Sequence, residues 1–296
     1  MGEAPQSRGR RRSPPLEDVV SHRSHFLVQP TLTQLPVATA ILALGSLAAC
    51  SAPTVDAAGH FGQYELDGHV AIDDSALGLT SSNSMDDLGL GDDDTAMGAY
   101  VRLKFGGPML YISAIQPEFA GTGTLSAEFS DGGVTIPVGT VVNSRLAMDV
   151  YTGMFIWDLF PTDFADVGLG FGVSVIDYDS SFENDGNGDT IASDETLPVP
   201  VLGAMVSKDF GPFQASGFLA YTSLDIDGDT LDYLDLDLRG TYHLFGGAPL
   251  TDNRGAGHLV LGYKLTDLEL EYQDGTEFGS ANLEISGPYL GLRFSF

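Results

Sequence analysis

The sequence, 296 residues long, is poor in cysteine, in positive charge and in long apolar runs. Its single cysteine, Cys50, excludes a disulfide bond within the chain. The 13 Lys and Arg residues stand against 41 Asp and Glu, a formal charge of −28, so the chain has no basic surface to neutralise nucleic-acid phosphates. After Cys50, no apolar run approaches the ~18 residues that a transmembrane helix needs.

Charged residues of either sign are few, whereas glycine is plentiful. Charged residues make up 18% of the chain, below the roughly 25% of typical soluble domains, and glycine contributes 37 residues. The hydrophobic share of 43% is too high for an intrinsically disordered chain. The composition therefore predicts an all-β protein with many turns.

An uncharged apolar segment over residues 35–49 is short for a membrane span but typical of the core of a signal peptide. It ends in Leu47-Ala48-Ala49-Cys50, which resembles the lipobox of bacterial lipoproteins. We therefore predict a leader over residues 1–49 that is cleaved before Cys50, and lipidation of Cys50. An ordinary signal peptide, cut near Ala48 or Ala57, is the alternative. The basic run at residues 8–13 lies far before the apolar core, which favours a later translation start.

Beyond residue 60, apolar residues alternate with polar or small ones. Residues 167–175 place an apolar side chain at every second position, with glycine or serine between, and residues 97–105, 234–245 and 258–265 have the same period. A period of two is that of a β-strand. The alternation continues for about as long as the 9–11 residues that a tilted strand needs to cross a bilayer.

The alternation and the turn signals predict ten strands. We expect them at residues 60–73, 96–105, 109–120, 138–158, 166–180, 196–210, 212–227, 231–246, 257–273 and 279–296. Short turns alternate with longer connections at residues 73–95, 121–137 and 183–195, as in outer-membrane barrels. The link at residues 246–257 is longer than this rule expects. Eight strands, with 60–73 or 109–120 outside the barrel, is the alternative.

The aromatic residues at the strand ends and two changes in the apolar alternation add further expectations. Phenylalanines would form an aromatic girdle at the periplasmic rim: Phe105, Phe160, Phe164, Phe210, Phe213, Phe245 and Phe296. The apolar phase changes between Leu265 and Leu268 and again between Ile285 and Leu290. Because proline lacks a ladder N–H, we expect a β-bulge at Gly287-Pro288.

From residue 60 onward the chain resembles a small bacterial outer-membrane β-barrel. The ending GPYLGLRFSF resembles the C-terminal signal that the barrel-insertion machinery recognises, with Tyr289, Leu292, Phe294 and Phe296 as its apolar residues. The resemblance implies an antiparallel transmembrane β-barrel of about ten strands, in contact with the lipid and lipopolysaccharide of a Gram-negative outer membrane. The predicted organisation is a leader over 1–49, a tether over 50–59 and the barrel over 60–296.

The few basic residues of the barrel fall on the phase opposite to the apolar one. We predict a lumenal charge network because Arg or Lys facing lipid costs roughly 2–4 kcal/mol and an unpaired buried charge is expensive. The predicted members are Arg102, Lys104, Arg145, Asp149, Asp235, Asp237, Arg239, His243, Lys264 and Arg293. Filling of the lumen is one interpretation, and a lining selective for a small solute is the other.

No segment predicts a catalytic or metal site. Residues 225–229 and 183–189 resemble fragments of calcium loops, but their glycine spacing is wrong for an EF-hand and typical of hairpin turns. Loose association of divalent cations with the acidic stretch 86–94 is expected instead. Some outer-membrane barrels, such as the omptin proteases, are enzymes, but no nucleophile elbow is present. We expect neither a cofactor nor an enzyme.

The sequence therefore predicts an integral outer-membrane barrel of a structural, solute-binding or porin-like transport type with acidic extracellular loops. A barrel hydrolase and a soluble β-barrel lipoprotein facing the periplasm are the alternatives.

Overall fold

A computed structural model of the chain describes residues 54–74, 79–91, 93–131, 134–161, 165–226, 228–246, 255–274 and 277–296. These residues belong to one compact unit, Ala48–Phe296. The predicted leader, Cys50 and residues 51–53 of the predicted tether lie outside the described residues, whereas residues 54–59 of that segment belong to the first strand. Within those ranges, no helix is long and apolar enough to cross a membrane.

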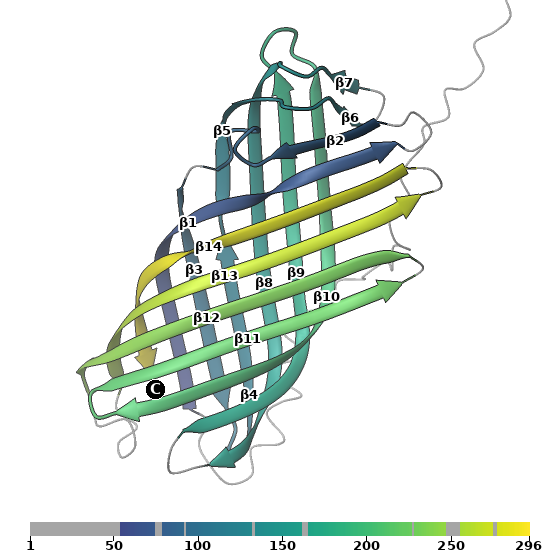
Figure 1. Cartoon of the computed structure of the whole chain (residues 1–296). Coiled ribbons are helices and arrows are strands. Elements are labelled where there is room, and N and C mark those ends of the chain that lie inside the picture. The colour runs from purple at the N-terminus through teal and green to yellow at the C-terminus, as the bar shows by residue number, and fades with distance from the viewer. Residues whose placement is uncertain are drawn as a thin grey trace, which may run out of the picture. The chain divides into compact units, whose positions relative to one another are not determined.

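The described chain is built from strands that form a closed antiparallel barrel (Figure 1). Their bounds are β1 Thr54–Asp74, β2 Leu79–Ser84, β3 Asp94–Lys104, β4 Pro108–Gln116, β5 Glu118–Thr124, β6 Phe129–Asp131, β7 Val134–Ile136, β8 Val141–Pro161, β9 Asp166–Asn184, β10 Thr190–Phe210, β11 Phe213–Ile226, β12 Asp229–Phe245, β13 Ala256–Asp274 and β14 Glu277–Ser295. Each wall strand pairs with the next one along the chain, and β14 pairs with β1 to close the barrel.

The predicted fold class and strand number are confirmed. The wall has ten strands when β4 and β5, separated only by Pro117, are taken as one. Because β1 and the β4–β5 segment are both in the wall, the eight-strand alternative is wrong. The structure adds β2, which extends the sheet along the end of β1, and a small hairpin of β6 and β7.

The outer surface of the wall divides into two zones. In the lower zone, toward the lower end of the barrel in Figure 1, the outward side chains are mostly apolar and exposed, and we call them the apolar belt. In the upper zone the same outward phase carries polar and acidic residues. The change falls between Leu265 and Asp267 on β13 and between Val175 and Asp177 on β9. The belt includes Phe61, Met97, Phe155, Trp157, Leu169, Phe171, Val173, Leu202, Leu219, Leu238, Leu259, Leu261, Leu290, Leu292 and Phe294.

The interior divides at the same level, in the opposite sense. The charged and polar side chains of the interior lie in the lower lumen, where buried apolar ones such as Met154, Ile156 and Phe218 line the opposite side, whereas the upper lumen is packed with buried apolar side chains. On β13, Lys264 points into the lower lumen and Leu268 into the upper lumen. The upper zone thus has the polar-out, apolar-in arrangement of a water-soluble barrel, and the lower zone has the reverse.

The turn over Met85–Gly91, which we call the cap, packs on the apolar side chains of the upper lumen. Leu88 and Leu90 of the cap are almost fully buried. Gly89 has a φ of 75°, and a Cβ on the neighbouring Gly121 would lie 1.9 Å from the Gly89 carbonyl oxygen. Two glycines therefore allow the cap to approach β5 closely.

A carboxylate fastens the cap to the connection that follows β5. The hydroxyl of Ser126 donates to the carboxylate of Asp87 at 2.7 Å, and the amide of Ser84 donates to it at 3.2 Å. These bonds lower the pKa of Asp87, that from Ser126 most. Because the pKa of Asp87 is lower in the folded chain than in the unfolded chain, these bonds contribute to folding stability at pH values above the usual aspartate range. The contribution is lost as the pH falls through the lowered pKa.

Two predictions about the strands are wrong. β14 has an unbroken register with β13 through Gly287 and Pro288, so no bulge occurs there. The apolar phase changes because the two residues lie in different zones. Ile285 points into the apolar upper lumen, and Leu290 is part of the apolar belt on the outer surface. Residues 183–195 are not a long loop, since β9 and β10 stay paired up to Glu183 and Thr190.

The predicted aromatic girdle is present in part at the lower end. Phe210, Phe213, Phe245 and Phe296 are exposed there, and Phe105 is half-buried. The side chains of Phe160 and Phe164 lie outside the described set.

The apolar belt generates a prediction for two outward positions on β13. Leu261→Arg should block assembly of the barrel in lipid vesicles, because it places a cation in the belt at a cost of roughly 2–4 kcal/mol. Glu269→Arg should assemble normally, since position 269 lies on the same phase in the polar upper zone. The fraction of heat-modifiable protein on a gel measures assembly, and equal yields for the two variants contradict the zoned wall.

Candidate functional site

The lower lumen holds a compact layer of charged side chains. Asp235, Asp237 and Arg239 project inward from β12 and Lys264 from β13, because alternate residues of a strand point to the same side. Their exposed fractions are 0%, 3%, 5% and 5%. Groups removed from water to this degree must be paired with one another.

Arg239 is held from several strands. Its Nη2 donates to Asp237 Oδ2 at 2.8 Å and to the Tyr111 hydroxyl at 2.5 Å, and its guanidinium carbon lies 4.0 Å from the ring centroid of Tyr100. The hydroxyl of Tyr289 donates to Asp237 Oδ1 at 2.5 Å. Both carboxylate oxygens of Asp237 are thereby occupied, and the arginine combines charged hydrogen bonds with a cation–π contact.

Lys264 forms the second buried pair. Its Nζ donates to Asp235 Oδ1 at 2.5 Å. The two partners lie in neighbouring inward rows of the ladder, since Asp237 pairs with Lys264 and Asp235 pairs with Thr266 in the register of β12 and β13. Four charges of alternating sign therefore fill the middle of the lumen.

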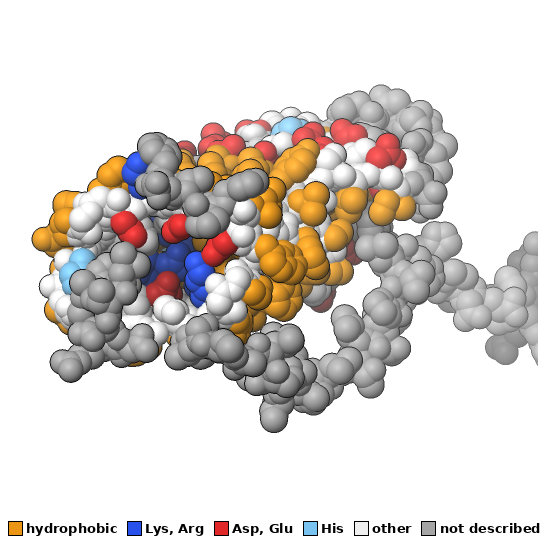
Figure 2. Space-filling view, turned by 90° about the horizontal axis from the view of Figure 1, so that it is seen from below, with side chains coloured by type: hydrophobic (Ala, Val, Ile, Leu, Met, Phe, Trp, Pro, Cys, Tyr) orange, Lys and Arg blue, Asp and Glu red, His pale blue; other side chains and the backbone are white. Residues whose placement is uncertain are grey.

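Three more inward cations lie nearer the lower mouth, where Figure 2 shows Lys and Arg side chains inside the opening with acidic ones around them. Their contacts are Arg102 to Asp56 at 3.0 Å, Lys104 to Asp158 at 2.7 Å and Arg293 to Gln214 at 2.7 Å. His243 also points inward there, with its ring centroid 5.0 Å from that of His258.

Two residues predicted for this network lie elsewhere. Arg145 is on the outer face of the upper zone, where it contacts Glu118 at 2.7 Å and Asp179 at 3.6 Å. Asp149 is also on the outer face. Both predictions are wrong because the apolar phase of residues 142–150 faces the lumen, so the polar phase of this part of β8 points outward.

The lumen also contains residues that the sequence analysis did not select. Asp56 continues the inward phase of Ala58 and His60, but it fell within the segment assigned to the tether. Tyr100 and Tyr111 occupy inward positions, and that phase was the available signal for both. Their role as partners of Arg239 depends on contacts between strands that are distant in sequence.

The four residues of the predicted C-terminal signal divide between the two faces of β14. Leu292, Phe294 and Phe296 are exposed on the outside by 47%, 42% and 62%, and Tyr289 is buried in the lumen. The structure thus places the apolar end of the chain on the belt, and recognition by the insertion machinery stays a prediction.

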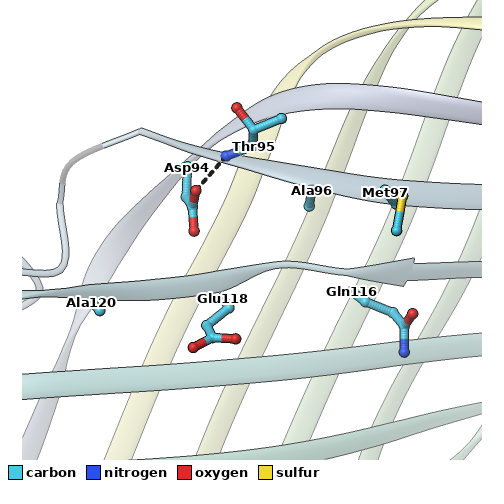
Figure 3. A pocket seen from close by; sticks show the side chains of 7 residues that line it. All are labelled: Asp94, Thr95, Ala96, Met97, Gln116, Glu118 and Ala120. Carbon is cyan, nitrogen blue, oxygen red and sulfur yellow. Dashed lines mark hydrogen bonds between the residues drawn. The ribbon is translucent and has the colours of Figure 1, made fainter.

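A second hollow lies in the wall rather than in the lumen. Pairing of β3 with β4 ends at Met97 and Gln116, and beyond this level β5 pairs only with β8. The resulting gap between β3 and β5 is a cavity of about 350 Å³ (Figure 3). Its lining is Asp94, Thr95, Ala96, Met97, Gln116, Glu118 and Ala120. Asp94 is turned back to accept a hydrogen bond from the Thr95 amide, and Glu118 is engaged by Arg145.

Within the described ranges, no group of three or more His, Cys, Asp or Glu side chains is placed to hold a metal ion. The turn at residues 184–189 uses its polar groups internally, since Asn184 Oδ1 accepts from the Gly186 amide and Asn187 Nδ2 donates to Asp189. The other segment compared with calcium loops, residues 225–229, lies where β11 and β12 meet as a hairpin, with Ile226 paired with Asp229.

Comparison with known proteins gives a match at the level of the fold. The outer membrane protease OmpT from Escherichia coli is similar with a TM-score of 0.51 and 11% identity over 82% of this chain and 97% of that one. The likeness shows the fold. This chain has the fold of an outer-membrane β-barrel, while an identity of 11% carries no information on activity.

Other solved barrels match with low structural scores. A Pseudomonas aeruginosa FadL homologue has a TM-score of 0.29 and 10% identity over 85% of this chain and 91% of that one. The transport unit of the autotransporter AIDA-I from Escherichia coli has a TM-score of 0.31 and 8% identity, with 88% and 97% covered. No protein-family model and no curated protein matches the sequence.

The buried pair of Lys264 and Asp235 generates a stability prediction. Asp235→Asn should destabilise the assembled barrel by about 3–5 kcal/mol, because it leaves the Lys264 charge buried without a partner. Combining Asp235→Leu with Lys264→Met should restore most of the loss. Urea unfolding of the refolded protein in detergent micelles measures these differences.

The pair of Lys104 and Asp158 is the matched control, since its side chains are 44% and 29% exposed. Asp158→Asn should cost no more than about 1 kcal/mol, as for exposed ion pairs. Equal costs for Asp235→Asn and Asp158→Asn contradict the assignment of a buried charge layer in the lumen.

Proposed function

We propose that this chain is an integral protein of the bacterial outer membrane, with the lower zone in the bilayer and the upper zone outside the cell. The observation that carries the proposal is the apolar belt, which surrounds a lumen of charged side chains. A water-soluble barrel would not leave so large an apolar surface uncovered, so the belt argues against the soluble alternative.

The orientation follows from the two ends of the wall. The lower end carries the short turns after β3 and β10, the longer link between β12 and β13 and the end of β14. The upper end carries β2, the cap and the hairpin of β6 and β7, beside the tight connections β11–β12 and β13–β14 (Figure 1). Outer-membrane barrels have short turns on the periplasmic side and longer connections outside. The lower mouth therefore opens to the periplasm.

The barrel is of the structural or solute-binding type rather than a diffusion pore. Buried ion pairs and tyrosines fill the lower lumen, and apolar side chains with the cap close the upper lumen. A barrel of about eight to ten strands is just wide enough for its interior to be filled by side chains. No contact among the described residues favours a hydrolase.

The outward surface of the upper zone is acidic, and Arg145 is its one cation within the described residues. We infer loose association of divalent cations with this surface and with the acidic connections, which would link it to lipopolysaccharide. The proposal includes cleavage of residues 1–49, lipidation of Cys50 and recognition of the C-terminal residues by the insertion machinery.

Planar-bilayer recording on the refolded protein tests the closed lumen. Heat-modifiable gel mobility verifies that the barrel has folded and inserted. The recording is made in about 1 M salt, where charges are almost fully screened. We expect no stable conductance steps above those of the bare bilayer. Regular, ohmic conductance steps from the wild-type chain contradict the closed barrel and support the porin-like alternative.

A further inference from the structure

Side chains able to donate hydrogen bonds gather at the lower mouth of the lumen. The strand register places Tyr100, Ala58, Arg293, His258 and His243 side by side on β3, β1, β14, β13 and β12. All lie on the inward phase of their strands, at the end where Figure 2 shows Lys and Arg inside the opening. Ala58 is the small member of this row, between an aromatic ring and an arginine.

Arg293 has no carboxylate partner within the described residues. The other four lumenal cations each contact one at 3.0 Å or less, but Arg293 donates from Nη1 to the neutral amide oxygen of Gln214 at 2.7 Å. The nearest carboxylate along that route is the exposed Asp209, which accepts from the other end of Gln214. Arg293 is only 6% exposed, and its Nε has no hydrogen-bond partner.

The surrounding groups leave further donors without partners. Arg102, one ladder row below, is 8% exposed, and its Nε is also unpartnered. So is Nδ1 of His243. The acidic neighbour, Asp56, is already occupied by the guanidinium of Arg102 at 3.0 Å and by the Ser295 hydroxyl at 2.5 Å.

Water can satisfy unpartnered N–H groups, but it cannot neutralise a charge. An arginine stays protonated in a protein. Asp56 is a single negative charge beside the two cations Arg102 and Arg293 and is paired with Arg102, so one buried positive charge is left without a counter-charge, which is costly. An oxyanion supplies both the negative charge and several acceptors, and the planar guanidinium matches its geometry.

We propose that the lower mouth contains a binding site for a small oxyanion, held between Arg293 and Arg102 over Ala58. The ligand class is the group shared by inorganic phosphate and small carboxylates, reaching the site from the open mouth. The physiological source of the ligand rests on the proposed function, which assigns this mouth to the periplasm, but the site itself does not.

Thermal melting of the refolded full-length chain in detergent, at pH 7 and constant ionic strength, tests the site. Inorganic phosphate and acetate are titrated separately, with chloride as the simple anion. Phosphate or acetate should raise the Tm of the wild-type chain saturably, and the one that acts at lower concentration identifies the source. Arg293→Gln should weaken this effect at least tenfold, whereas Arg145→Gln, on the outer face, should leave it unchanged.

A pair of variants at Ala58 keeps the test independent of the assembly of Arg293→Gln. Ala58→Asp brings a carboxylate beside Arg293, so it should melt at a higher temperature than the isosteric Ala58→Asn and lose the response to oxyanions. The proposal is overturned if neither phosphate nor acetate stabilises the wild-type chain beyond chloride, or if the two Ala58 variants melt alike. Either of these results would leave the prediction of a non-conducting barrel unaffected. Conversely, a barrel that conducts in planar bilayers could still show the response to oxyanions.

Discussion

The solvent outside the barrel changes along each wall strand, and the strands cross this boundary without a break in their pleat. Side chains on one face of a strand must therefore suit lipid below the boundary and water above it. On β13 the outward phase runs from Leu261 to Glu269, and the inward phase runs from Lys264 to Leu268. One register satisfies both environments because the apolar and polar phases exchange faces at a common level.

The contents of the lumen follow from this arrangement. Below the boundary the lipid takes the apolar phase, so polar side chains face inward, and burial forces them to pair as Arg239 does with Asp237. Above the boundary the apolar phase faces inward, where it forms a core and receives Leu88 and Leu90 of the cap. Ion pairs thus occupy the lumen at one level and apolar packing occupies it at the next.

The sequence predicted the fold and the lower zone well, because a single phase rule holds there. Arg102, Arg239 and Lys264 lie on the lumenal side of their strands, the side that this rule assigns to them. It failed for Arg145 and Asp149, and it predicted a bulge at Gly287-Pro288, for a shared reason: the apolar phase of the upper zone was taken to face lipid. The tyrosines that hold Arg239 could not be predicted, since their contacts depend on how strands distant in sequence come together around the lumen.

The most direct test of the exchange of faces is a scan of outward positions on β13 in a chain whose own cysteine has been replaced. A fluorophore attached at position 261, 263, 265, 267 or 269 in lipid vesicles is exposed to a lipid-soluble quencher and to a water-soluble one. The account predicts quenching from lipid up to position 265 and from water from position 267 onward. A profile in which lipid quenching continues through position 269, or in which no position is quenched from lipid, contradicts it.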